Sequence, residues 1–108
     1  MRKAGLAVLA CAAVLWTTPA HAAEADDATL HRYAADTWAS FVAMTDEQSG
    51  LPADSLNADG TRSVQTSTTN IGAYMWSAVA AERLGILGHK ELVARMRTTL
   101  HTLAWGGP

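Results

Sequence analysis

The chain has 108 residues, which is room for one small domain. Hydrophobic residues make up 49% of it and charged residues 17%, a balance that excludes a largely disordered chain. The net charge is −2, and it is about −4 once residues 1–22 are removed, which argues against a nucleic-acid binder and against a binder of anionic membranes, because both need a basic face.

The first 22 residues have the pattern of an export signal. Residues 2–3 are basic, and residues 4–16 form an uninterrupted apolar run. This run is shorter than the roughly 20 residues that a membrane-spanning helix needs. Residues 20–22, Ala-His-Ala, then place small side chains where signal peptidase requires them. We therefore predict a signal-peptide helix over 1–22, cleavage after Ala22 and a periplasmic or secreted protein; the alternative is an N-terminal core helix.

Cys11 is the only cysteine and offers a second route of processing. Residues 8–11, Val-Leu-Ala-Cys, loosely resemble the site at which lipoproteins are processed. The apolar run continues past this cysteine to Trp16, which favours ordinary cleavage instead. The mature chain would then contain no thiol and no disulfide. It would have six basic and ten acidic side chains.

The mature chain is expected to begin with a flexible leader and a helix. Residues 23–29 are small and acidic, which suits a leader that ends in a helix cap. A helical stripe of apolar residues then predicts a helix over 27–44. Trp38 and Phe41 are its largest side chains and are expected to anchor the core. Stacking against a carbohydrate ring is the alternative role for either aromatic ring.

Residues 45–66 are predicted to form a long polar loop, because Ser-Gly and Asp-Gly turn dipeptides and Pro52 interrupt regular structure. Leu51, Leu56 and Val64 are the apolar side chains that could attach this loop to a core. A loop of this length in so small a domain is usually functional or disordered.

Two further helices are predicted after the loop, over 68–84 and 90–104. The first is expected to be capped near Ser67 and to end at Gly85, and the short connector between the two predicts an antiparallel hairpin. With no strand pattern in the sequence, the fold class is all-α. The residues expected to share one core are Trp38, Phe41, Met75, Val79, Met96 and Leu100.

Motifs for metal or cofactor chemistry are missing from the sequence. The histidines do not have the spacing of a zinc site, and there is no nucleophile elbow, phosphate loop or dinucleotide fingerprint. We therefore expect neither a metal nor a cofactor.

Acidic and neutral polar residues of the long loop are the remaining candidates for chemistry. Glycosidases use two carboxylates on opposite sides of a sugar bond, and the loop holds four acids: Asp46, Glu47, Asp54 and Asp59. Solvated turn residues are the alternative interpretation, and Asp54 is a weak catalytic candidate. Residues 65–70 are dense in amide and hydroxyl groups that suit sugar hydroxyls; a redundant helix cap is the alternative.

Two motifs resemble those of the glucoamylase-like (α/α) toroid superfamily. Residues 46–54, DEQSGLPAD, resemble its D-x-x-T-G-L-P-x-D segment, and residues 66–72, TSTTNIG, resemble its T-S-P-T-N-I-G segment. Residues 80–87 and 95–103 are similar to the helical hairpin that follows. The superfamily includes β-1,2-glucanases, the glucoamylase-like part of cyclic β-1,2-glucan synthases, and related exported domains of unknown function. The resemblance covers about residues 30–104.

The resemblance implies that residues 30–105 are three helices of an incomplete toroid. Asp54, Thr66, Thr69 and Asn70 match motif positions that face the substrate cavity in the superfamily, so they are the expected glycan-binding residues. The superfamily's acid and base carboxylates lie further along a much longer chain. The resemblance therefore implies an N-terminal fragment, truncated before its catalytic pair and without full activity on its own.

The sequence departs from the superfamily's pattern at two positions and leaves three functions open. Ser49 stands for threonine in the first motif, and Thr68 stands for proline in the second. The first function is a truncated glycan hydrolase related to enzymes that act on β-glucan, with a retaining or an inverting mechanism. The second is a small exported glycan-binding or accessory module. The third is a structural helical domain that is completed by another chain or self-associates through exposed apolar helix faces.

Overall fold

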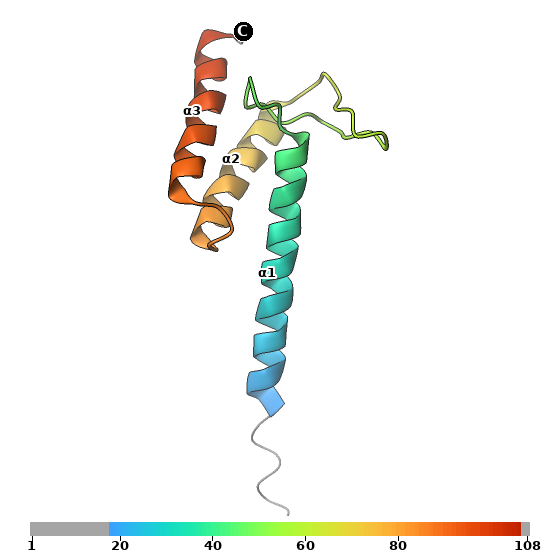
Figure 1. The fold of residues 1–108 in the computed structure, drawn as a ribbon, viewed down its shortest axis with the longest axis vertical. Coiled ribbons are helices and arrows are strands. Elements are labelled where there is room, and N and C mark those ends of the chain that lie inside the picture. Colours follow the sequence, from blue (N-terminus) through green and yellow to red (C-terminus); the bar gives the residue numbers. More distant parts are fainter. Residues whose placement is uncertain (1–17, 107–108) are drawn as a thin grey trace, which may run out of the picture. The chain divides into compact units, whose positions relative to one another are not determined.

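The fold is all-α, as predicted. The computed structural model describes residues 18–106, with side chains from residue 23 onward. Its helices, in chain order, are α1 (Thr18–Met44), α2 (Thr68–Arg83) and α3 (His89–Trp105) (Figure 1). Among the described residues, strand-like pairing is limited to two isolated bridges, Thr45 with Pro52 and Leu56 with Arg62.

Helix α1 begins nine residues before the predicted helix at 27–44, so the expected leader (23–29) is helical. Five of the nine residues 20–28 are alanine, the strongest helix former, and Pro19 lies in the first turn, where its missing N–H costs nothing. The apolar run of the predicted export signal falls in residues 1–17, outside the described residues. No helix among residues 18–106 combines the length and the apolar character needed to cross a membrane.

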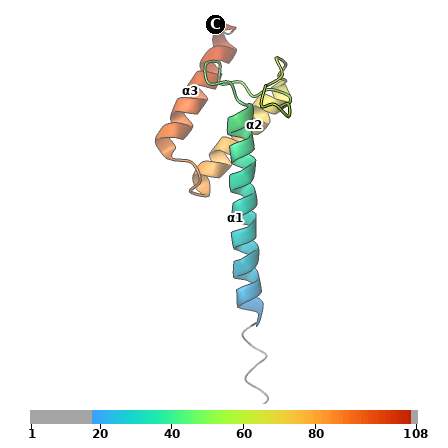
Figure 2. The ribbon, with the colours of Figure 1, turned by 45° about the vertical axis from the view of Figure 1, so that its right-hand side comes forward.

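Helices α2 and α3 form the predicted hairpin. The Oγ of Ser67 accepts a hydrogen bond from the backbone N–H of Asn70 at 3.1 Å and so caps α2. Gly85, with φ of +72°, follows the last turn in the left-handed conformation that favours glycine. The connector then turns the chain, and Figures 1 and 2 both show α3 running in the opposite direction to α2. Both predicted helices are confirmed to within one residue at each end.

The described residues divide into two units after Leu30, and the core lies in the second unit, which begins at His31. Its centre is Tyr74 of α2, which is 1% exposed. The ring of Trp38 stacks on Tyr74 with centroids 5.8 Å apart, and the ring of Phe41 is tilted against it at 6.2 Å. Burial of such large rings is the main stabilising contribution in a domain of this size.

Small and aliphatic residues complete this core. The remaining buried members are Ala78, Ala81 and Leu87, and the partly buried ones are Phe41, Val42, Met75, Ile86, Leu92 and Met96. The prediction was correct for Trp38, Phe41, Met75 and Met96. It was wrong for Val79 and Leu100, which are 39% and 51% exposed because they lie on helix faces that the described residues leave uncovered.

Two of the three apolar side chains expected to attach the connection between α1 and α2 do not do so. Val64 is fully exposed and Leu56 is 43% exposed, whereas Leu51 is partly buried. Thr45, Pro52 and Ala53 are buried. Beyond these buried residues, the attachment of the connection depends on polar contacts, which also position the candidate site.

Candidate functional site

The first motif folds into a closed turn around Asp46. Its Oδ1 accepts three hydrogen bonds, from the N–H of Gln48 at 3.1 Å and from the N–H and hydroxyl of Ser49 at 2.8 and 3.0 Å. The N–H of Gly50 donates to the Asp46 carbonyl at 2.8 Å, and the N–H of Asp46 donates to the Leu51 carbonyl at 3.0 Å. The N–H and hydroxyl of Ser49 stabilise the carboxylate and hold the pKa of Asp46 below its usual value.

Two threonines of α3 hold this turn from one side. Thr99, which is fully buried, donates its hydroxyl to the Gly50 carbonyl at 2.8 Å, and Thr102 donates to the Ser49 carbonyl at 2.6 Å. Gly50 has φ of +67°, and a Cβ there would lie 2.8 Å from the backbone nitrogen of Thr99. Glycine is required at this position because both the conformation and the close approach exclude a side chain.

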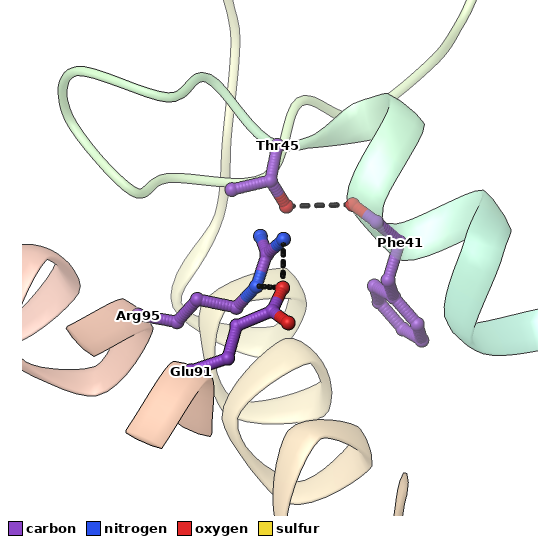
Figure 3. Close-up of polar contacts among 4 residues, drawn as sticks. All are labelled: Phe41, Thr45, Glu91 and Arg95. Atoms are coloured by element: carbon purple, nitrogen blue, oxygen red, sulfur yellow. Dashed lines mark hydrogen bonds and ion pairs between the residues drawn. The ribbon is translucent and has the colours of Figure 1, made fainter. Parts of the chain in front are cut away.

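The end of α1 holds the turn from the other side. The Thr45 hydroxyl donates to the Phe41 carbonyl at 2.7 Å (Figure 3). The guanidinium of Arg62 donates to the Thr45 carbonyl. The N–H of Ala53 donates to the Met44 carbonyl at 2.9 Å. Residues 46–53 of the first motif are thus fixed to α1 and to α3.

The second half of the connection, residues 54–65, is a hairpin-like loop that pairs mainly with itself. Its bonds run from the N–H of Asp54 to the Gln65 carbonyl at 2.8 Å and from the N–H of Ser63 to the Ser55 carbonyl at 3.0 Å. At its tip, Asp59 accepts from the hydroxyl and the N–H of Thr61, which lower the pKa of Asp59. Most side chains of this half are exposed.

Asp54 and Asn70, one from each motif, meet at the N-terminus of α2. The amide Nδ2 of Asn70 donates a hydrogen bond to Oδ1 of Asp54. The backbone N–H of Asn70 is already capped by Ser67, so backbone and side chain of Asn70 are both fixed. The bond directs the amide nitrogen toward Asp54 and leaves the amide oxygen as the acceptor for a ligand.

Thr66 and Thr69 lie on either side of this pair in the sequence. Thr66 is exposed and lines a surface pocket of about 360 Å³. The polar side chains on the walls of that pocket are those of Asp46, Ser49, Arg62, Ser63, Gln65 and Thr66. Thr69 is exposed in the first turn of α2. The structure therefore brings Asp54 and Asn70 into contact, adds Thr66 through the neighbouring pocket, and places Thr69 in the same helical turn as Asn70.

The acids of the connection have different surroundings. Asp46 and Asp59 each accept hydrogen bonds within a turn, whereas Asp54 is bonded to another motif residue. Across residues 18–106, no three histidine, cysteine or acidic side chains gather as ligands for a metal ion. The arrangement offers hydrogen-bond acceptors and donors for hydroxyl groups.

Sequence reasoning missed the residues that fix the first motif, namely Arg62, Thr99 and Thr102. Arg62 lies in a polar loop with no pattern to distinguish it from a solvated side chain. The threonines carried a signal: both fall on the side of α3 that faces the rest of the fold, where a hydroxyl must find an acceptor.

Comparison with known proteins places this chain in a family. The chain is 34% identical over 77 residues to the cyclic β-(1,2)-glucan synthase NdvB of Rhizobium meliloti (strain 1021). The match covers 68% of this chain but only 3% of that relative. No solved structure matches the chain. A family model matches residues 32–105, which include both motifs and all three helices' core residues, and the chain thus belongs to the family described as "Protein of unknown function (DUF3131)".

Proposed function

We propose that this chain is an exported helical domain that binds β-glucan at the N-terminus of α2, through Asp54, Thr66, Thr69 and Asn70. The hydrogen bond between Asp54 and Asn70 is the observation that carries the proposal, because it joins two separate motifs into one polar surface. The name of the relative supports a glucan as the ligand, since that protein is a cyclic β-(1,2)-glucan synthase.

The chemistry of this surface suits a sugar. A sugar hydroxyl donates one hydrogen bond and accepts others, so it needs acceptors and donors side by side. Asp54 supplies acceptors, and Asn70 supplies an amide whose orientation is already set by Asp54. The hydroxyls of Thr66 and Thr69 can act as either partner. Fixing these groups in advance lowers the entropy lost when a ligand binds.

Binding without efficient cleavage is the activity that these residues support. Hydrolysis of a glycosidic bond needs two carboxylates about 5–10 Å apart, on opposite sides of the bond. Asp46 and Asp59 are occupied within their turns, and Asp54 accepts a hydrogen bond from Asn70. We propose a domain related to glycoside hydrolases that has little or no activity on its own, with Asp54 as the catalytic candidate to test.

The same proposal includes the domain organisation. It comprises a signal peptide over 1–22, a leader over 23–29 that is helical rather than flexible, and a domain over 30–105 built like part of an (α/α) toroid. The match of the family model to residues 32–105 supports the boundary of the third segment. Mass spectrometry of the protein from its native host tests the cleavage site, which we expect after Ala22.

Titration of the ¹⁵N-labelled chain with a linear β-1,2-gluco-oligosaccharide tests the binding site. We expect saturable chemical-shift changes at the Asn70 side-chain amide and at the backbone N–H groups of Thr66 and Thr69. Asp54→Ala should weaken binding about tenfold, because Asn70 loses its orientation and the sugar loses an acceptor. Asp36→Asn, which removes an exposed carboxylate from α1, is the charge control and should bind as the wild type does.

Shifts that do not saturate, or that leave Asn70 unchanged, would contradict this site. Release of reducing ends from β-1,2-glucan is the companion assay. We expect no useful turnover, and turnover that disappears in Asp54→Asn would overturn the proposal of binding alone and identify a catalytic acid.

A structural role is the second candidate function, and exposed aromatic residues favour it. Trp76 of α2 is 78% exposed and Trp105 of α3 is 77% exposed, together with half-exposed Leu100 and Leu103. Large exposed apolar side chains of this kind mark surfaces for association. Sedimentation of the wild type and of Trp76→Gln tests this role. A wild-type dimer that becomes monomeric in the variant supports it. If both proteins are monomers, self-association through Trp76 is excluded.

A further inference from the structure

A second pocket, of about 170 Å³, lies between the turn of the first motif and α3. Its lining includes Thr45, 3% exposed, and Tyr74, 1% exposed. Arg95 and Thr98 line it from α3, and the acids Asp46 and Glu47 line it from the turn. Nothing in the sequence motifs or the matched relatives assigns a role to this pocket.

Arg95 is held rigidly at the edge of this pocket. Its Nε and Nη2 both donate to Oε1 of Glu91, at 2.9 and 2.7 Å, and its guanidinium carbon lies 5.5 Å from the centre of the Trp38 ring. Figure 3 shows the guanidinium pointing toward Thr45. Partial burial lowers the pKa of Arg95, but the hydrogen bonds with Glu91 and Tyr74 have a larger effect in the opposite direction. The pKa of Arg95 is therefore raised.

The charges around the pocket disfavour an anionic ligand. An anion would be repelled by the carboxylates of Asp46 and Glu47. Arg95 would not compensate fully, because its Nε and Nη2 already donate to Glu91. A neutral hydroxyl avoids this penalty, because its oxygen can accept from a guanidinium while its hydrogen is donated to a carboxylate.

We propose that the Arg95 pocket is a second sugar subsite, which takes a single neutral sugar ring or a similar small polyol. Its volume is below the 300–1,000 Å³ or so of pockets for drug-sized ligands, which limits the occupant to about one ring. The inference rests on the proposed function only in the choice of a sugar. The residues that bind it are separate from Asp54, Thr66, Thr69 and Asn70.

Titration of the full-length ¹⁵N-labelled chain with D-glucose and, in a second arm, with the β-1,2-linked disaccharide tests this subsite. We expect saturable shifts at the Arg95 Nε–H and the backbone N–H groups of Glu47 and Thr98. The affinity obtained from these shifts should fall about tenfold in Glu47→Gln and about threefold in Thr98→Val. The matched controls are Asp36→Asn and Thr37→Val, both exposed on α1 and outside the pocket, and both should bind as the wild type does.

The outcomes separate this subsite from the proposed function. Shifts confined to Thr66, Thr69 and Asn70 would overturn the Arg95 subsite and leave the proposed site intact. Shifts confined to the Arg95 pocket would support the subsite and contradict the proposed site. Affinity that is unchanged in Glu47→Gln and Thr98→Val would overturn the subsite even if its signals move. A response to glucose alone would identify a free monosaccharide as the ligand, and a tighter response to the disaccharide would identify a glycan.

Discussion

The two halves of the connection between α1 and α2 are similar in composition and different in attachment. Residues 45–53 are bonded to α1 through Thr45 and Ala53 and to α3 through the hydroxyls of Thr99 and Thr102. Residues 54–65 are bonded mainly to one another, and their side chains are mostly exposed. Both halves contain a glycine with positive φ and an aspartate that closes a turn, so these local features do not decide attachment.

This difference shows what fixes a polar loop in a domain with a small core. The attached half buries few large apolar side chains, and its stability depends on buried hydroxyls that reach backbone carbonyls from a neighbouring helix. A buried carbonyl left without a donor costs about 1–3 kcal/mol. Removing one of these hydroxyls should therefore destabilise the fold by more than the net stabilisation of a single hydrogen bond. The candidate site begins where the attached half ends, at Asp54.

The largest expected effect comes from adding a methyl group at Gly50, and Gly60 in the other half is the comparison. Gly50→Ala should lower the free energy of unfolding by about 2–4 kcal/mol, because φ is positive and the new Cβ would lie 2.8 Å from the Thr99 nitrogen. Gly60 has φ of +84°, and a Cβ there would meet no atom within 4 Å beyond its chain neighbours, so Gly60→Ala should cost only about 1 kcal/mol. Urea unfolding measures both, and equal losses would contradict the difference in attachment.

The next effect separates a buried threonine hydroxyl from an exposed one. Thr99→Val removes the buried donor to the Gly50 carbonyl and should cost about 1–3 kcal/mol of stability. Thr61→Val removes an exposed hydroxyl that donates to Asp59 at 2.7 Å and should change stability by less than about 0.5 kcal/mol. A Thr99→Val protein with wild-type stability would show that the turn does not need α3.

Helix positions and caps were predictable from the sequence, because local patterns determine them. The stripe of α3, the cap at Ser67 and the stop at Gly85 are signals that act within a few residues. The start of α1 was missed because the acidic residues 24–27 were interpreted as a leader, whereas the surrounding alanines favour helix.

Burial and attachment were less predictable, because they depend on which helix face finds a partner. Val79 and Leu100 fit an apolar stripe as well as Met75 and Met96 do, yet they are exposed. Tyr74 was not among the residues expected to form the core, yet it lies at its centre. For the site, the sequence identified Asp54 and Asn70 separately, and only the fold brings them into contact.

A smaller effect concerns pH. The folded pKa of Asp46 is lowered by the N–H and hydroxyl of Ser49, so its contribution to stability is complete above the ordinary aspartate pKa of about 3.9. The contribution is lost as the pH falls through the lowered folded value. Asp46→Asn should therefore be less stable than the wild type at pH 6, and the difference should shrink by pH 2.5. Urea unfolding at the two pH values measures it, and a constant difference would contradict the role of the carboxylate charge.

The smallest effect on stability is expected at Asp54, where the attached half meets the candidate site. Asp54 is exposed, so Asp54→Ala should change the free energy of unfolding by less than about 0.5 kcal/mol. Its effect should appear in ligand binding instead. A large loss of stability in Asp54→Ala, measured by urea unfolding, would show that the bond to Asn70 holds the loop rather than the site.

Isothermal titration of a β-1,2-gluco-oligosaccharide into the wild type, Asp54→Ala, Asn70→Ala and the double variant tests the central claim most directly. If the hydrogen bond between Asp54 and Asn70 makes them one binding unit, each single variant should lose about tenfold in affinity. The double variant should then lose clearly less than the product of the two single losses. Wild-type affinity in both single variants, or losses that multiply without coupling, would contradict a glucan site built on this pair.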